Sequence, residues 1–221
     1  MSSFPISRLT VAKQDFSGQC LESFERLVSG MLIVALSPIL FAVAAVTYRL
    51  SGRSPLIAHR RVGQHGSELW VLKFRTMWEV RAEPGAIGRF CSIEYIDDQC
   101  GPDLKGPRDP RVASRFARFC RRHSLDELPQ LLLVLRGRMS LVGPRPVTAG
   151  ELERIYGADA EEVVQVKPGV AGLWQVSGRN RLTLEERRQL DLKCVRERSL
   201  KLYFWIVLRT IPEIFSGANT W

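Results

Sequence analysis

The hydrophobic positions of the chain include one long uninterrupted run near the N-terminus. Residues 27–48 (LVSGMLIVALSPILFAVAAVTY) contain no charged side chain. As a straight helix this run would be about 33 Å long, which matches the hydrocarbon thickness of a bilayer. The run begins too late and is too long for a secretory signal peptide, and no clear small-residue cleavage site follows it. The pattern predicts a membrane helix over residues 21–52, preceded by a poorly structured segment of residues 1–20.

Ser37 and Pro38 lie near the middle of this run. Proline removes a backbone donor and crowds the preceding turn, so the helix should be broken or kinked there. One interpretation is a bilayer-spanning helix that tolerates the kink. The other is a re-entrant helix with both ends on one membrane face, in which the Ser37 hydroxyl is a local partner for the freed backbone group. Arginines after the run place the rest of the chain in the cytoplasm under either interpretation.

The remainder of the chain has shorter patterns. Alternating apolar and polar residues around a glycine-containing turn predict a β-hairpin over residues 56–77. Glycine, proline and aspartate predict mostly loop over residues 81–111, while residues 129–139 and 181–215 have helical character. The stretches GPRP and VKPGVAGLWQVSGRN are predicted to be loops held by proline and glycine.

Two further segments, residues 112–122 (VASRFARFCRR) and 202–208 (LYFWIVL), combine apolar side chains with basic residues within or beside them. Each could lie at the membrane interface or cover the protein core, and the sequence favours neither. The overall prediction is a helix-rich α/β fold, in which residues 53–221 form a single compact domain against the membrane.

The net charge of the chain is +9, with a pI of about 9.8. This balance indicates anionic partners, which include nucleic acid, an acidic membrane surface and phosphorylated substrates. The basic residues share loops with proline, glycine and acids and form no stripe with stacking aromatics, which argues against nucleic acid. A non-catalytic basic membrane-surface protein or nucleic-acid-binding protein stays as the alternative. Five cysteines without a C-x-x-C pair, three histidines without metal spacing and no P-loop exclude the common zinc and nucleotide motifs.

Asp126 and Glu127 are adjacent acids in the stretch HSLDELPQL. Ser124 and Glu127 match the S-x-x-E capping box, in which both side chains would satisfy backbone donors. Pro129 argues against that role, because it would be the fifth residue of the helix and proline prefers the first turn. From spacing alone, a helix start and an acidic site are equally supported.

Phosphoryl chemistry could use such a pair, since it combines a carboxylate nucleophile, a hard cation and fixed positive charge. Arg145 lies between two prolines of GPRP, so little backbone entropy is lost when it binds an anion. Further candidates for binding phosphate are Lys73, Arg75, Arg121 and Arg122. The acids Asp97, Asp98 and Asp103 could attract a metal, but a solvated loop is the favoured interpretation of that segment.

The motifs KFRTM, DPRV, SLDELPQL, GPRP and KPGVAGLWQVSGRN follow one another in this order. This series resembles the bacterial sugar transferase family, the monotopic phosphoglycosyl transferases, over residues 22–221. The chain looks like the short form of the family. Its GLWQVSGRN stretch and its C-terminal end resemble the members that begin exopolysaccharide synthesis with a hexose 1-phosphate.

The resemblance implies a reaction in which a sugar 1-phosphate moves from a UDP-sugar to undecaprenyl phosphate, with release of UMP. It implies that Asp126 is the nucleophile of a covalent intermediate, that Glu127 binds Mg²⁺, and that Arg145, Lys73 and Arg121 contact phosphate.

The same resemblance favours the re-entrant helix, a place in the bacterial inner membrane and a catalytic domain that faces the cytoplasm. Glucose or galactose is favoured as the sugar, with an N-acetylated sugar as the alternative. The expected partners are the UDP-sugar, undecaprenyl phosphate and the lipid bilayer, with no nucleic acid. A homodimer is compatible with the sequence, which does not decide the oligomeric state.

Overall fold

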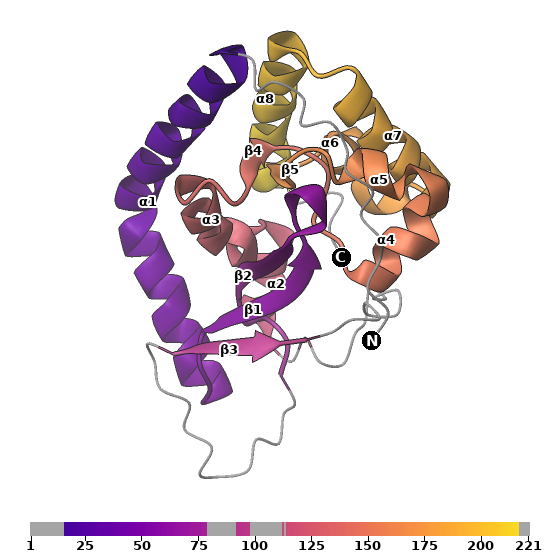
Figure 1. Cartoon of the computed structure of the whole chain (residues 1–221). Helices are drawn as coiled ribbons and strands as arrows, with labels where there is room; N and C mark the ends of the chain where they lie inside the picture. The colour runs from indigo at the N-terminus through magenta and orange to yellow at the C-terminus, as the bar shows by residue number, and fades with distance from the viewer. Residues whose placement is uncertain (1–15, 79–91, 98–111, 113, 217–221) are drawn as a thin grey trace.

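The long apolar run forms one continuous helix in the computed structural model, which describes residues 16–78, 92–97, 112 and 114–216. This helix, α1, extends over Phe16–Ser51 and contains Pro38 (Figure 1). It begins five residues before the predicted start at residue 21, while residues 1–15 lie outside the described part. Pro38 cannot donate to the carbonyl of Val34 four residues earlier. The Ser37 hydroxyl donates to that oxygen instead, at 2.8 Å, which is the local partner that the sequence predicted.

The exposure of α1 supports a membrane element. Within the described ranges it is the one helix long and apolar enough to cross a bilayer. Only 11% of its most apolar stretch is buried inside the protein, and large side chains such as Leu27, Val34 and Phe41 are exposed. A core helix of a soluble protein would bury such residues.

Polar contacts attach α1 to the domain near its N-terminal end. The Glu25 carboxylate is buried and accepts hydrogen bonds from Ser140 Oγ at 2.6 Å and Leu141 N at 3.0 Å. Lys167 Nζ lies 2.7 Å from Glu22 Oε1. At the other end of the helix, Val43 packs in an apolar cluster with side chains from the domain. The domain therefore contacts α1 near both of its ends.

The predicted hairpin is confirmed as strands β1 (Leu56–Val62) and β2 (Glu68–Phe74), which pair antiparallel around a 3₁₀ turn at Gln64–Gly66. A third strand, β3 (Ile93–Ile96), pairs parallel with β1 and completes a sheet of order β2-β1-β3. The prediction of loop over residues 81–111 was therefore wrong at β3, because strand pairing with β1 recruits a segment whose local composition is typical of loops. Residues 81–91 and 98–111 lie outside the described part.

The segment after the sheet carries the acidic pair. Helix α2 (Arg115–Arg122) leads to a 3₁₀ turn, Leu125–Gln130, and then to helix α3 (Leu131–Leu135). Strand β4 (Ser140–Val142) follows and pairs parallel with the later strand β5 (Gly169–Ala171). A side chain at Gly169 would overlap the backbone of Gly143, so this close approach requires glycine.

The last part of the chain is helical. Its elements are α4 (Ala149–Tyr156), a 3₁₀ turn at Gly157–Asp159, α5 (Ala160–Val163), α6 (Leu173–Ser177), a 3₁₀ turn at Arg179–Arg181, α7 (Leu184–Arg196) and α8 (Leu200–Ser216). Capping boxes start α4 and α7. The predicted helical region 181–215 is confirmed but is divided into α7 and α8. The predicted loop VKPGVAGLWQVSGRN contains β5 and α6, so that prediction was wrong over these residues.

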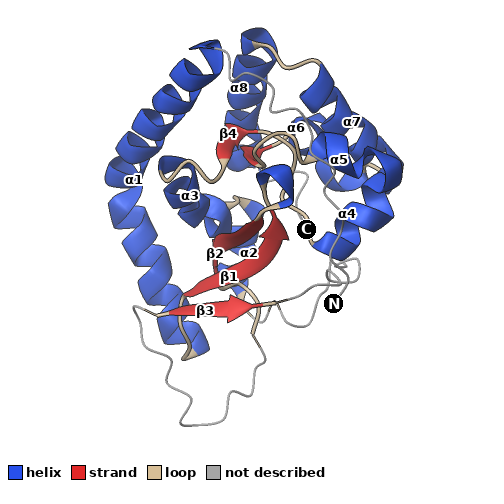
Figure 2. Cartoon of the chain, viewed as in Figure 1, coloured by secondary structure: helices blue, strands red, loops and turns tan. Residues whose placement is uncertain are grey.

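The strands lie between α1 on one side and the C-terminal helices on the other (Figure 2). This arrangement confirms a helix-rich α/β fold. The two amphipathic segments each have a buried and an exposed face. In α8, Tyr203 and Ile206 are buried while Trp205 and Leu208 are exposed, and in α2 Phe119 is 52% exposed. Both segments therefore cover the core and also present apolar surface.

Candidate active site

The turn that carries the two acids has an unusual backbone. Ser124 adopts left-handed angles, with φ of 54°, and its side chain makes no capping hydrogen bond. Its hydroxyl accepts a hydrogen bond from the Arg179 guanidinium at 2.7 Å. The capping-box interpretation was therefore wrong, and α3 begins only after Pro129, as the position of that proline indicated.

Glu127 is the centre of an ion-pair cluster. Its Oε1 atom lies 2.8 Å from Lys73 Nζ and 3.4 Å from an Arg145 guanidinium nitrogen. Burial alone would raise the pKa of this carboxyl. The charges of Lys73, Arg145 and Arg179 outweigh that effect and lower the pKa of Glu127 well below its ordinary value. Glu127 is therefore ionised at neutral pH and serves as a fixed negative charge.

Asp126 has the opposite shift. Burial and the adjacent Glu127 charge raise its pKa to about 6, while the charges of Lys73 and Arg121 oppose the rise. Two neighbouring acids with pKa values moved in opposite directions are typical of active sites in which each acid has a different task. A carboxylate with a pKa near 6 is more basic than an ordinary aspartate and is still mostly ionised at pH 7.

The structure separates the predicted basic residues into two groups. Lys73, Arg121 and Arg145 act on the acidic pair through contacts or charge. Arg75 is only 4% exposed, and its Nε donates to the Ser54 carbonyl at 2.8 Å while its guanidinium pairs with Glu94. Arg75 therefore connects the sheet to the chain that precedes it, and these contacts do not support its predicted role in binding phosphate.

Arg179 is a residue that the sequence reasoning missed. It is in the predicted VSGRN loop, where its backbone has φ of 51°. Its charge acts on both Asp126 and Glu127, and burial lowers its own pKa. Two residues with left-handed backbone, Ser124 and Arg179, thus meet beside the acids, and such strain is common at functional sites. The arginine between glycine and asparagine was the available signal.

Arg145 interacts with a buried acid, Asp191, that the sequence also did not indicate. Asp191 on α7 is 1% exposed and accepts a 2.7 Å hydrogen bond from the Tyr156 hydroxyl. Burial raises the pKa of Asp191 to about 7, and the hydrogen bond from Tyr156 and the positive charge of Arg145 limit the rise. The Arg145 guanidinium lies 5.9 Å from the centre of the Trp174 ring. These contacts hold the GPRP loop in place.

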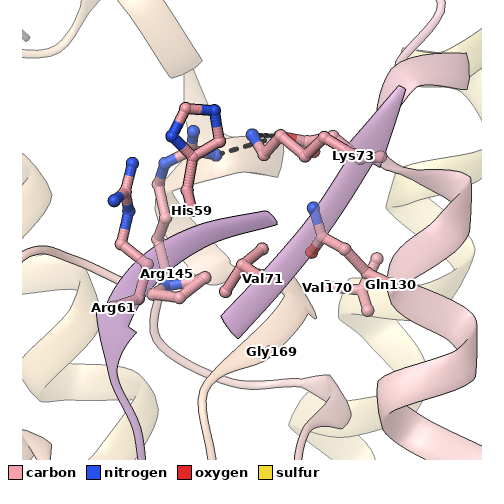
Figure 3. A pocket seen from close by; sticks show the side chains of 10 residues that line it. His59, Arg61, Val71, Lys73, Gln130, Arg145, Gly169 and Val170 are labelled. Carbon is pink, nitrogen blue, oxygen red and sulfur yellow. Dashed lines mark hydrogen bonds and ion pairs between the residues drawn. The ribbon is translucent and has the colours of Figure 1, made fainter. Parts of the chain in front are cut away.

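A cavity of about 30 Å³ opens beside Glu127. Its polar lining comes from the two hairpin strands, the acidic turn and the GPRP loop, and the residues are His59, Arg61, Lys73, Glu127, Gln130 and Arg145. Figure 3 shows the labelled basic side chains on the same side of the two strands. In the part of the lining that the structure describes, positive groups outnumber carboxylates, so the cavity is suited to an anion.

The acidic pair can hold a hard cation only with help from other ligands. Among the described residues there is no group of three histidine, cysteine or acidic side chains. Mg²⁺ is commonly bound by one or two carboxylates together with substrate phosphates and water. The ionised Glu127 beside a cavity with a basic lining fits that kind of site.

A helix with membrane composition, a carboxylate pair held by cations and a cavity with a basic lining are the features expected of a membrane-associated enzyme for phosphorylated substrates. The family model described as bacterial sugar transferase matches residues 18–217, and the chain belongs to this family.

Named relatives extend this result. The chain is 37% identical to the exopolysaccharide production protein ExoY of Rhizobium meliloti, over 96% of this chain and 93% of the relative. It is 39% identical to the undecaprenyl-phosphate galactose phosphotransferase of Salmonella typhimurium, over 89% of this chain and 39% of that longer relative. It is also 35% identical to the UDP-glucose:undecaprenyl-phosphate glucose-1-phosphate transferase of Caulobacter vibrioides, over 88% and 69% of the two chains.

Proposed function

We propose that this protein transfers a hexose 1-phosphate from a UDP-sugar to undecaprenyl phosphate and releases UMP, as the first membrane step of exopolysaccharide synthesis. The activities for which the Salmonella and Caulobacter relatives are named, and the similarity to ExoY, support this assignment. They favour galactose or glucose over an N-acetylated sugar.

The observation that carries the proposal is the division of labour between the two acids. Asp126, with its raised pKa, is the nucleophile, and Glu127 is held ionised by Lys73 and Arg145. An Asp126 oxygen attacks the phosphorus that carries the sugar, and the bond from this phosphorus to the bridging oxygen breaks. The bridging oxygen keeps the electron pair and leaves on UMP. A phosphate oxygen of the lipid then attacks the same phosphorus, which restores the Asp126 carboxylate.

Glu127 would hold the Mg²⁺ ion, which supplies charge neutralisation for the diphosphate of the donor. Glu127→Gln keeps the shape of the side chain but removes the charge. We expect this variant to lose its Mg²⁺-stimulated activity. An unchanged dependence of the rate on Mg²⁺ concentration would refute the metal role of Glu127.

The membrane arrangement fits a lipid acceptor whose phosphate stays at the headgroup level. We propose that α1 is re-entrant and that the catalytic domain faces the cytoplasm at the bacterial inner membrane. Two observations support this. The domain packs near both ends of α1, through Glu25 and through Val43, and the Ser37 hydroxyl satisfies the carbonyl freed by Pro38. The aromatic side chains on the exposed face of α8 suit the interfacial depth.

A screen of UDP-sugars with undecaprenyl phosphate and Mg²⁺, read by UMP release, tests the reaction. We expect release with UDP-glucose or UDP-galactose. A donor labelled in the sugar should label wild-type protein at Asp126 in the absence of lipid, and label should leave when undecaprenyl phosphate is added. Silence across the panel, or turnover without label at Asp126, would refute the reaction or the nucleophile respectively.

The topology of α1 has its own test. A cysteine placed near residue 5 of a cysteine-free variant should be protected from an impermeant thiol reagent added to intact cells. Labelling from outside would instead establish a bilayer-spanning helix.

A further inference from the structure

The cavity beside Glu127 has a wall on strand β1 that the chemistry at Asp126 does not use. His59 and Arg61 form this wall. We propose that Arg61, with His59 beside it, binds the α-phosphate of the UDP-sugar, which is the phosphate that departs as UMP. This assignment rests on the proposed function and names the side chains that recognise the leaving half of the donor.

The strand register places these side chains. His59 pairs with Val71 and Ile57 pairs with Lys73, so His59, Arg61 and Lys73 share one face of the hairpin. Figure 3 shows His59 and Arg61 on the side of the strands that Lys73 and Arg145 also approach. Arg60, which lies between His59 and Arg61 in the sequence, belongs to the opposite face of the hairpin.

The contacts of Arg60 confirm that it belongs to the other face. Its guanidinium lies 3.0 Å from Glu68 and 3.0 Å from Asp97, and it does not line the cavity. Of the two adjacent arginines on β1, Arg61 faces the cavity and Arg60 faces the outer surface. Arg60 therefore supplies a matched control for Arg61.

The charge balance of the cavity favours a phosphate. Arg61, Lys73 and Arg145 line it, and among the described lining residues Glu127 is the one acid. Glu127 is engaged by Lys73 and Arg145, and Arg61 adds a third positive charge to the lining. One Arg61 nitrogen donates to the Arg60 carbonyl at 2.6 Å, which orients the guanidinium. A guanidinium presents further donors that match the oxygens of a phosphate.

The reaction places its largest change of charge at this position. When the bond between the sugar-bearing phosphorus and the bridging oxygen breaks, that oxygen becomes a terminal oxygen of UMP and gains a negative charge. A fixed cation at the α-phosphate stabilises this charge as it develops. The cavity of about 30 Å³ admits a water or a phosphate oxygen, so a whole phosphate requires the long basic side chains to move outward.

Asp126, which the lipid phosphate must approach in the proposed second step, is acted on by a cation from another element. Arg121 acts on Asp126 from α2, whereas His59 and Arg61 come from β1. Removal of Arg61 should therefore affect the step that releases UMP and spare the step that uses the lipid.

The test uses the full chain in nanodiscs, with UMP and uridine as probes in calorimetric titrations. Arg61→Gln is compared with Arg60→Gln, and Arg61→Lys tests rescue by charge. We expect Arg61→Gln to weaken UMP binding by about ten-fold or more, the effect of one charge-assisted hydrogen bond. Uridine binding should not change, because the contact is to phosphate. Arg60→Gln should bind UMP as the wild type does, and Arg61→Lys should recover part of the loss.

The kinetics of the two half-reactions show whether Arg61 acts on the donor phosphate or on the lipid phosphate. Arg61→Gln should slow UMP release from UDP-sugar in the absence of lipid, while undecaprenyl phosphate discharges the preformed intermediate at the wild-type rate. Equal UMP binding in both glutamine variants would overturn the proposal, as would a defect confined to the discharge step. If wild-type protein releases no UMP from any UDP-sugar, the proposed function fails, and the UMP titration still decides the role of Arg61. Thermal unfolding of each variant shows whether it is folded. If Arg61→Gln is not folded, Arg61→Lys is used in its place.

Discussion

Lys73 and Glu127 are 54 positions apart in the sequence, and their charged atoms lie 2.8 Å apart in the structure. This ion pair joins strand β2 to the turn that carries both acids. It keeps Glu127 ionised, and the negative charge of Glu127 in turn helps to raise the pKa of Asp126. Lys73 also acts on Asp126 directly and lowers its pKa, while Arg145 and Arg179 help to keep Glu127 ionised.

The first prediction concerns Asp126→Asn. This variant should lose activity by roughly 10³-fold or more, because the nucleophile is absent. Burial and Glu127 raise the pKa of Asp126 from 3.8 to about 6, so the folded state holds this proton more tightly than the unfolded state. Its contribution to stability therefore falls as the pH rises from about 4 to 6, and at pH 7 the ionised group is destabilising.

The amide variant lacks this penalty. We expect its unfolding temperature at pH 7 to equal or exceed that of the wild type, and the difference to shrink towards pH 4. Calorimetry at the two pH values measures this. A variant that is less stable at pH 7 and equally stable at pH 4 would contradict the raised pKa.

The second prediction concerns the pH dependence of UMP release in the absence of lipid. The wild-type rate should fall as the pH decreases through about 6, because protonated Asp126 cannot attack. Lys73 lowers the pKa of Asp126, so Lys73→Met should move this acid limb to higher pH as well as reduce the maximal rate. A reduced rate with the limb in its original place would show that Lys73 does not act on Asp126. Arg60→Gln serves as the charge-matched control.

The third prediction concerns the attachment of α1. Glu25→Leu removes the acceptor for Ser140 Oγ and Leu141 N, both close to the GPRP loop. Two buried donors are then without that partner, and we expect a loss of about 1–3 kcal/mol in unfolding free energy. Glu22→Gln removes the partly exposed ion pair with Lys167 and should cost less than about 1 kcal/mol. Denaturant unfolding in a mild detergent compares the two, and equal losses would argue against Glu25 as the main polar anchor.

The fourth prediction concerns the support of Arg145. Tyr156→Phe removes the 2.7 Å hydrogen bond to Asp191, so the pKa of Asp191 should rise above its value of about 7. Because the charges of Asp191 and Arg145 interact, a change at Asp191 should shift the GPRP loop and lower kcat by about ten-fold or more. Tyr203→Phe is the control, since Tyr203 is a buried tyrosine on α8 whose pKa is affected by Glu25 and not by Asp191. Comparable kcat values for the two variants would exclude a positioning role for Tyr156.

Features encoded by neighbouring residues could be predicted from the sequence. The uncharged run predicted the membrane helix, and Pro38 with Ser37 predicted the local repair of its backbone, because these properties depend on composition and on contacts within one turn. The hairpin followed from alternation around a short turn. Asp126, Glu127, Lys73 and Arg145 were all named as candidates, since their residue types stand in loops of recognisable composition.

Only the tertiary structure decided which candidates meet. Local spacing could not choose between a capping box and an acidic site, because the choice depends on Lys73 and Arg145, which contact Glu127 across many intervening residues. For the same reason Arg75, two residues from Lys73, was indistinguishable from it until its partners Ser54 and Glu94 were known. Strand β3 also depends on pairing with a distant strand.

Asp191 and Arg179 are the clearest examples of this limit. An acid within a helix is usually solvated. The sequence contains no sign that Asp191 is buried and interacts with Arg145. The sequence by itself thus determined the membrane element and the inventory of chemical groups. The structure determined their pairing, burial and pKa values, because these depend on electrostatic fields and solvent exclusion created by residues that are distant in the chain.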